Sequence, residues 1–141
     1  MFLGIGNTAL GDDGAGPCFI NSLGLVSRSH KYKFIDCGTL PEMFVKEIKA
    51  ASPALIVFVD AADYGGAKAE IRELSLKEID GMTASTHHMP LTVLTKFLAE
   101  EIKPAPEFLF IGIQAASINP GDELDGDIIH SINNFVSVLV I

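Results

Sequence analysis

The feature that most constrains the fold is a continuous apolar run, ALIVFV at residues 54–59, which ends at Asp60. A strand without alternating polar residues must be covered on both faces, as in a parallel sheet with helices packed on each side. Residues 108–113 form a second run of this kind. Both are far shorter than the roughly 20 apolar residues that span a bilayer, so they predict buried strands.

The rest of the chain alternates between predicted strands and predicted helices. Strands are expected at residues 2–6, 33–36, 54–60 and 108–113, with a short edge strand at 70–74. Helices are expected at residues 15–26, 41–50 and 90–101, followed by a closing helix with an apolar stripe of Ile128, Ile132, Phe135 and Leu139. This alternation predicts a single α/β domain over residues 1–141. It would have three α/β/α layers and a mostly parallel, twisted sheet of about five strands with helices on both faces.

Composition narrows the class of protein. Hydrophobic residues make up 48% of the chain and charged residues 20%, which is typical of a globular domain. The net charge of −8 argues against nucleic acid and, more weakly, against anionic membranes. The chain has two cysteines in no metal-binding spacing and no apolar leader before the first strand, so we expect a cytoplasmic protein, with a monomer as the simplest state.

Polar side chains follow the predicted parallel strands where they end. They are Asn7, Asp36, Asp60 and Gln114. Open α/β sheets bind ligands beyond the carboxyl ends of their strands, so these residues are candidates for a site. The alternative is that each Asp or Asn merely initiates a turn by bonding to nearby backbone amides.

Two loops lead into helices on the same side of the predicted sheet. Residues 11–17 (GDDGAGP) contain Asp12 and Asp13, of which one can cap the helix while the other faces the site. Residues 85–90 (STHHMP) contain His87 and His88, of which one can readily face it. Two carboxylates and one imidazole suit divalent first-row metal ions and leave coordination positions open. The residues therefore predict a metal-dependent or metal-recognising site.

A glycine pattern at residues 4–9 (GIGNTA) offers an alternative, because it resembles the opening of a dinucleotide fingerprint. The acidic residues that follow would repel phosphate unless a metal lay between them. We interpret the glycines as allowing positive φ and close backbone approach. A domain that binds nucleotide with magnesium on Asp13 remains the competing hypothesis.

The motifs together resemble the hydrogenase maturation endopeptidases. The resemblance is carried by residues 6–7 with 11–17, 35–39 (IDCGT), 59–61, 86–91 (THHMPL) and 112–114. It implies an enzyme that removes a carboxy-terminal extension from a hydrogenase large-subunit precursor after nickel insertion. It also implies that Asp13, Asp60 and His87 are the metal ligands and the catalytic residues, with no metal role for His88.

In this resemblance the nickel is supplied by the substrate, and zinc or cadmium could take its place in vitro. Nickel would act as a Lewis acid, or Asp13 or Asp60 would act as general base. Asn7, Asp36 and Gln114 are expected to support the site or contact the substrate. A nickel-sensing scaffold without protease activity would have the same site, so the sequence leaves that alternative open.

Overall fold

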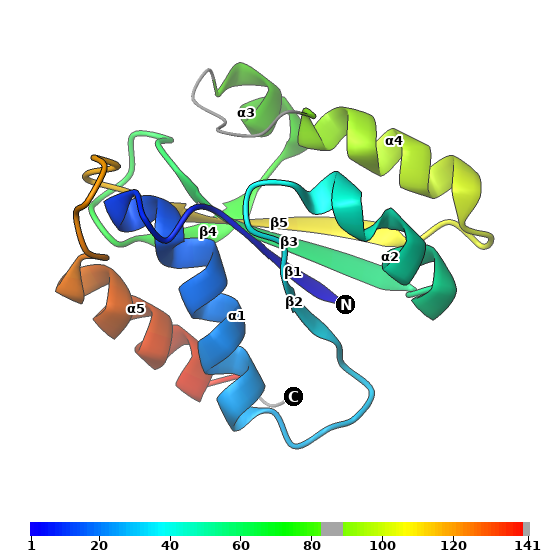
Figure 1. The fold of residues 1–141 in the computed structure, drawn as a ribbon, viewed down its shortest axis with the longest axis horizontal. Helices are drawn as coiled ribbons and strands as arrows, with labels where there is room; N and C mark the ends of the chain where they lie inside the picture. Colours follow the sequence, from blue (N-terminus) through cyan, green and yellow to red (C-terminus); the bar gives the residue numbers. More distant parts are fainter. Residues whose placement is uncertain (83–88, 140–141) are drawn as a thin grey trace.

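The computed structural model describes residues 1–82 and 89–139, and in them one sheet lies between helical layers (Figure 1). The strands are β1 (Phe2–Ile5), β2 (Phe34–Asp36), β3 (Leu55–Ala62), β4 (Ile71–Leu74) and β5 (Glu107–Gln114). Their order is β2-β1-β3-β5-β4. β4 is antiparallel to β5 at one edge, and all other pairs are parallel. The predicted α/β fold with a mostly parallel sheet is confirmed.

Helices cover both faces of this sheet (Figure 1). α1 (Ala15–Val26) and α5 (Gly126–Ser137) pack on one face. α2 (Val45–Ala51) and α4 (Leu91–Glu101) pack on the other, where α3 (Leu76–Gly81) contacts α4. Two short 3₁₀ helices, η1 (Gly11–Gly14) and η2 (Pro41–Phe44), precede α1 and α2.

The central strand β3 explains why the apolar run is continuous. Ile56 and Phe58 belong to the core beneath α2 and α4, whereas Val57 and Val59 belong to the core beneath α1 and α5. All four side chains are almost fully buried. Because successive strand residues point to opposite faces, a strand between two helical layers needs an apolar residue at every position.

Three elements differ from the sequence-based expectation. β3 does not end at Asp60 but continues to Ala62, because Ala61 and Ala62 pair with Ile113 and Gln114 of β5. The helix expected over residues 41–50 begins as a 3₁₀ turn, and regular α-helix starts at Val45. Helix α3 was not predicted at all.

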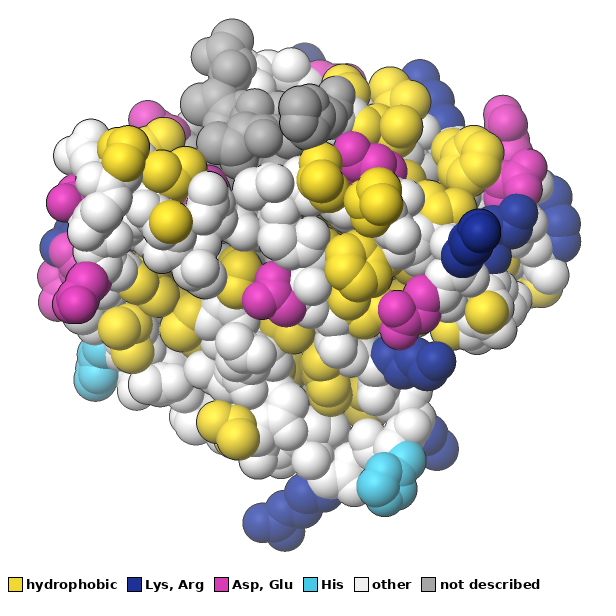
Figure 2. Space-filling model, in the orientation of Figure 1, with side chains coloured by type: hydrophobic (Ala, Val, Ile, Leu, Met, Phe, Trp, Pro, Cys, Tyr) yellow, Lys and Arg dark blue, Asp and Glu magenta, His cyan; other side chains and the backbone are white. Residues whose placement is uncertain are grey.

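The surface and the helix lengths bear on possible partners. In the part of the chain that the structure describes, no helix is long and apolar enough to cross a membrane. On the face drawn in Figure 2, Lys and Arg side chains lie among acidic and uncharged ones rather than forming a continuous basic surface. This distribution matches the net charge of −8.

Candidate active site

Glycines bring the start of α1 down onto the ends of β1 and β3. Gly6 has φ +143°, and a Cβ there would lie 1.8 Å from the carbonyl oxygen of Asp13. A Cβ on Gly16 would lie 2.2 Å from the oxygen of Ile5 and 2.6 Å from that of Val59. Only residues without a side chain fit these approaches, so the glycine pattern serves backbone packing, as we inferred, and places η1 at the carboxyl edge of the sheet.

Asp13 is held at this edge by the backbone that leaves β1. Its side chain is buried, and its Oδ2 accepts the Asn7 N–H at 2.7 Å. The Asn7 side chain in turn accepts the Ala9 N–H at 2.9 Å, which fixes the turn. The Asp13 carboxylate thus accepts the Asn7 N–H, a backbone group that would donate to a phosphate in a dinucleotide site. The backbone N–H of Asn7 thus orients the Asp13 carboxylate.

Asp12 has a different role from its neighbour. Its Oδ2 accepts the N–H groups of Ala116 and Ser117 at 2.8 and 2.9 Å, and its Oδ1 accepts the Asp125 N–H at 3.0 Å. Neither η1 nor α1 has a side-chain cap, so the prediction that Asp12 or Asp13 caps the helix is wrong. Asp12 instead ties the segment between β5 and α5 to η1.

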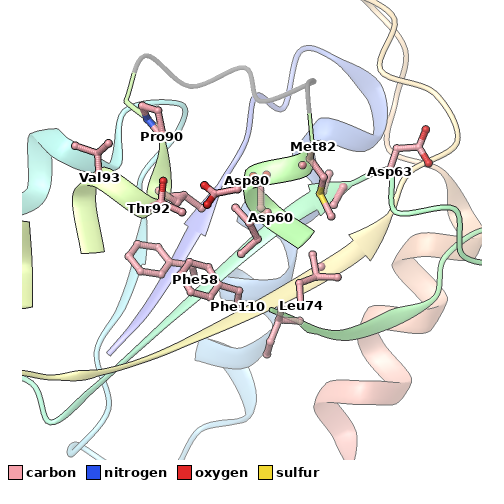
Figure 3. A pocket seen from close by; sticks show the side chains of 17 residues that line it. Phe58, Asp60, Asp63, Leu74, Asp80, Met82, Pro90, Thr92, Val93 and Phe110 are labelled. Carbon is pink, nitrogen blue, oxygen red and sulfur yellow. The ribbon is translucent and has the colours of Figure 1, made fainter. Parts of the chain in front are cut away.

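Asp60 lines a cavity of about 500 Å³ at the carboxyl edge (Figure 3). In the sheet it pairs with Ile5 of β1 on one side and with Gly112 of β5 on the other. The cavity is walled by residues of β3, β4, β5, α3 and the start of α4. Two more carboxylates, Asp63 and Asp80, line it, and no sequence motif had pointed to either.

Gln114, at the end of β5, holds the loop that follows β3. Its Oε1 accepts the N–H groups of Tyr64 and Gly66 at 3.1 and 3.0 Å, and its Nε2 donates to Asp63 Oδ1 at 3.0 Å. The side chain is buried, and its Nε2 also donates to the Ala115 carbonyl. The bond from Gln114, followed by that from the Gly65 N–H, lowers the pKa of Asp63.

Of the other two expected residues, only Asp36 lies in the described part of the chain. Asp36 is exposed on the edge strand β2, where its Oδ1 accepts the Gly38 N–H at 3.0 Å, a typical turn interaction. His87, like His88, lies outside the described residues. The elements before and after residues 83–88 in the chain, α3 and α4, both line the cavity.

The cysteines are poor candidates for a nucleophile. Burial, followed by the charges of Asp36 and Glu47, raises the pKa of the Cys37 thiol to about 12. Burial also raises the pKa of Cys18. A thiol in such surroundings stays protonated near neutral pH and is unreactive. Outside residues 83–88 and 140–141, no three His, Cys, Asp or Glu side chains are grouped closely enough to hold a metal ion.

Fold and site together define a class: an α/β protein with carboxylates at the carboxyl edge of a mostly parallel sheet, beside a cavity. Comparison with known proteins narrows that class. Over residues 23–140 the chain matches the family described as hydrogenase maturation protease. The chain belongs to this family.

Individual relatives agree with the family match. The hydrogenase 3 maturation protease of Escherichia coli K12 is 36% identical over 115 residues, which cover 81% of this chain and 71% of that protein. A crystal structure of the NiFe hydrogenase maturation protease HycI from Thermococcus kodakarensis superposes with a TM-score of 0.86 at 28% identity, covering 97% of this chain and 86% of that one. A crystal structure of the hydrogenase 3 maturation protease has a TM-score of 0.83 at 30% identity and covers 99% and 87%.

The resemblance drawn from sequence motifs is therefore confirmed, and the chain is a hydrogenase maturation endopeptidase. The family and the carboxylate beside β1 both speak against the magnesium–nucleotide hypothesis.

Proposed function

We propose that this endopeptidase removes the carboxy-terminal extension of a hydrogenase large-subunit precursor after nickel has been inserted. In the proposal, nickel already bound by the precursor completes its coordination with Asp13, Asp60 and His87. The observation that carries the proposal is that Asp13, in η1, and Asp60, in β3, lie at the same edge of the sheet, where Asp60 lines a cavity.

The two carboxylates lie at neighbouring positions of the fold. η1, which contains Asp13, contacts β3, which contains Asp60. β1 ends at Ile5, the partner of Asp60, and Asp13 is bonded to the backbone just two residues further on. This proximity of η1 and β3 supports the proposal that both carboxylates bind one metal ion. A carboxylate has about four lone-pair sites, so the bond from Asn7 leaves Asp13 able to bind a metal.

The roles follow from the chemistry of the ligands. Asp13, Asp60 and His87 would hold the nickel that the precursor carries, and that ion would supply Lewis acidity to the scissile carbonyl or to a bound water. In the alternative mechanism, Asp13 or Asp60 would serve as the general base instead. Asp12 is not a candidate for either role, because its oxygens accept three backbone N–H groups. Asn7 orients Asp13, and Gln114 holds the loop that carries Asp63.

The cavity beside Asp60 is a suitable place for the extension. Its volume of about 500 Å³ lies within the range of small-ligand sites and admits a few residues of peptide. Its floor is apolar, with Phe58 and Phe110, whereas Asp60, Asp63 and Asp80 add negative charge.

The direct test compares two forms of one precursor. Nickel-loaded and metal-free large-subunit precursor are incubated with the enzyme, and the intact mass of each is measured. Loss of a carboxy-terminal peptide from the loaded form alone is the expected result. Asp13→Asn, Asp60→Asn and His87→Ala are expected to abolish it.

Asp127→Asn is the matched control, because Asp127 is an exposed carboxylate in the first turn of α5, which packs on the face of the sheet opposite α4. It is expected to cleave as the wild type does. Equal cleavage of the metal-free precursor would overturn the role of nickel. Binding without cleavage of a loaded precursor would favour the scaffold hypothesis for this chain.

A further inference from the structure

Helix α3 is a wall of the cavity that has little holding it in place. It has six residues, none of them buried, yet Ile79, Asp80 and Gly81 line the cavity together with Met82 just beyond it. A helix this short does not form by itself in water, so contacts with the rest of the protein must fix it.

Glu78 provides the polar contacts at the start of α3. Its Oε2 accepts the Ser75 N–H at 2.8 Å, and the Ser75 hydroxyl accepts the Glu78 N–H at 3.3 Å, which completes a capping box. Its Oε1 accepts a bond from Arg72 of β4 at 2.8 Å. One carboxylate therefore both caps α3 and joins it to the sheet.

Arg72 is itself held against the sheet by an aromatic ring. Its guanidinium lies over Tyr64, 4.2 Å from the ring centroid. The Tyr64 hydroxyl donates to the Glu70 carbonyl at 2.7 Å, and its N–H donates to Gln114. The stack therefore fixes the arginine above the loop that follows β3.

A glycine makes room for this stack. A Cβ on Gly112 would lie 3.1 Å from the Tyr64 ring and 2.4 Å from Leu74 Cδ1. Gly112 pairs with Asp60 on one side and with Arg72 on the other. Paired positions of a sheet face the same side, so Asp60 and Arg72 flank Gly112 in one row on the face that bears the cavity.

We propose that Arg72 is a positioning residue: stacked on Tyr64 and paired with Glu78, it sets α3 as a cavity wall at a fixed place relative to Asp60. The proposal rests on the proposed function, since the cavity is taken to receive the precursor's extension. Arg72 does not touch the reacting atoms in this role.

The role predicts a particular kinetic effect. If α3 leaves its place, only a fraction of molecules has a complete cavity, and the apparent affinity for the precursor falls by that fraction. Once substrate is bound, the wall is in place and the chemical step is unchanged. Loss of Arg72 should therefore raise KM and leave kcat nearly as it was.

The test measures KM and kcat for cleavage of the nickel-loaded precursor. Arg72→Met keeps the aliphatic stem but loses the ion pair and the stacked cation. We expect KM to rise by at most about five-fold, because that is the limit set by the loss of one partly exposed ion pair and one cation–π contact. Arg72→Lys keeps the charge and is expected to recover part of this loss. Glu78→Gln tests the contact from the other side, on a side chain exposed enough to be replaced without unfolding the protein.

Lys68→Met is the matched control. It removes an exposed lysine that pairs with Asp125 and Asp127 at the start of α5, on the other face of the sheet. Its KM should equal that of the wild type. A KM unchanged in both Arg72→Met and Glu78→Gln, or a loss confined to kcat, would overturn the proposal.

Hydrogen exchange gives a readout that does not depend on cleavage. Amides of residues 76–81 should exchange about five-fold faster in Arg72→Met, while those of α1 and β3 should keep their rates. Equal acceleration throughout would mean that Arg72 only stabilises the whole fold. If the wild type cleaves no precursor, the proposed function fails, whereas local exchange at α3 would still show the positioning contact.

Discussion

Asp12 and Asp13 show that two neighbouring residues of the same type can have different roles. Asp12 and Asp13 are both buried at the carboxyl edge, at 2% and 5% exposure. Asp12 accepts three backbone N–H groups of the segment between β5 and α5, whereas Asp13 accepts one from the turn after β1. Asp12 is thus tied to the fold, whereas the single bond to Asp13 leaves lone pairs for the role that we propose for it.

We predict that substitution by asparagine lowers the stability of the protein at Asp12 and its cleavage activity at Asp13. Asp12→Asn places an amide nitrogen among backbone donors, and a buried donor left without an acceptor lowers the free energy of unfolding by about 3 kcal/mol. Urea unfolding of the purified variants measures this effect. Asp13→Asn should lose cleavage but remain within about 1 kcal/mol of the wild type. Equal stability of Asp12→Asn and wild type would contradict the assignment.

Gln114 gives a prediction that depends on pH. Gln114→Leu leaves the N–H groups of Tyr64 and Gly66 without their acceptor, at a cost of about 2 kcal/mol. It also removes the main cause of the lowered pKa of Asp63, which should rise toward 3.8. A carboxyl NMR titration of Asp63 in both proteins measures this change.

The sign of the stability effect follows from the direction of the shift. In the folded wild type the pKa of Asp63 is below its unfolded value, so its contribution is present above about pH 3.8 and is lost as the pH falls through the folded value. In Gln114→Leu, the free energy of unfolding should lack the contribution that Asp63 makes in the wild type and loses in acid. An unchanged pKa of Asp63 in Gln114→Leu would show that the amide is not its cause.

The sequence indicated candidate site residues as polar residues after apolar strands. The residues that it did not indicate are placed by the pairing of strands far apart in the chain. Asp13 and Asp60 could be placed at one edge because a parallel sheet brings its strand ends together. The row of Asp60, Gly112 and Arg72 could not be predicted. The register of the antiparallel edge strand depends on its pairing with a segment far away in the chain, which no local pattern reveals. Three partners of the Gln114 side chain, Asp63, Tyr64 and Gly66, are about 50 residues away, beyond any local signal.

At the scale of elements, helix α1 offers a matched pair of glycines. Gly16 faces the backbone oxygens of Ile5 and Val59, where a Cβ would lie 2.2 and 2.6 Å away. Gly24 is exposed in the same helix and meets nothing within 4 Å. Alanine substitutions at the two positions therefore measure two effects separately. Gly16 reports the close approach of α1 to the sheet, and Gly24 reports the helix propensity of glycine.

We predict that Gly16→Ala destabilises the protein by about 3 kcal/mol, since main-chain atoms must move to admit the methyl group. Gly24→Ala should stabilise it by about 0.5–1 kcal/mol, because alanine is the better helix former. Thermal unfolding of the two variants beside the wild type measures both. A small effect at Gly16 would mean that α1 can lift from β1 and β3 at little cost.

Secondary structure was predictable wherever an apolar pattern repeats. The apolar run lies in β3 from Leu55 on, and Ile128, Ile132 and Phe135 lie in α5, because burial on two faces or on one leaves a distinct periodicity. Leu139, the last residue of the predicted stripe, lies beyond the end of α5 at Ser137. Helix α3 has no buried residue and so leaves no such pattern. Its signal was the local capping box of Ser75 and Glu78. The 3₁₀ start at Pro41 likewise depends on turn geometry rather than on burial.

At the scale of the whole molecule, the described residues supply two carboxylates to the proposed metal site, and the rest of the coordination is proposed to come from His87 and the substrate. The isolated enzyme should then bind a borderline divalent ion only moderately, because few protein ligands hold it. Zinc or cadmium can stand in for nickel in such an experiment.

We predict that zinc at about 100 times its dissociation constant stabilises the isolated enzyme by about 2.7 kcal/mol, which raises Tm by roughly 6–10 °C. Asp60→Asn should remove this shift, because it takes away a ligand. Asp36→Asn should keep it, because Asp36 bonds to the turn at Gly38 on the outer strand β2. Zinc should also compete with cleavage of the nickel-loaded precursor in the wild type. A shift that persists in Asp60→Asn would place the ion elsewhere on this acidic protein and would remove Asp60 from the metal site.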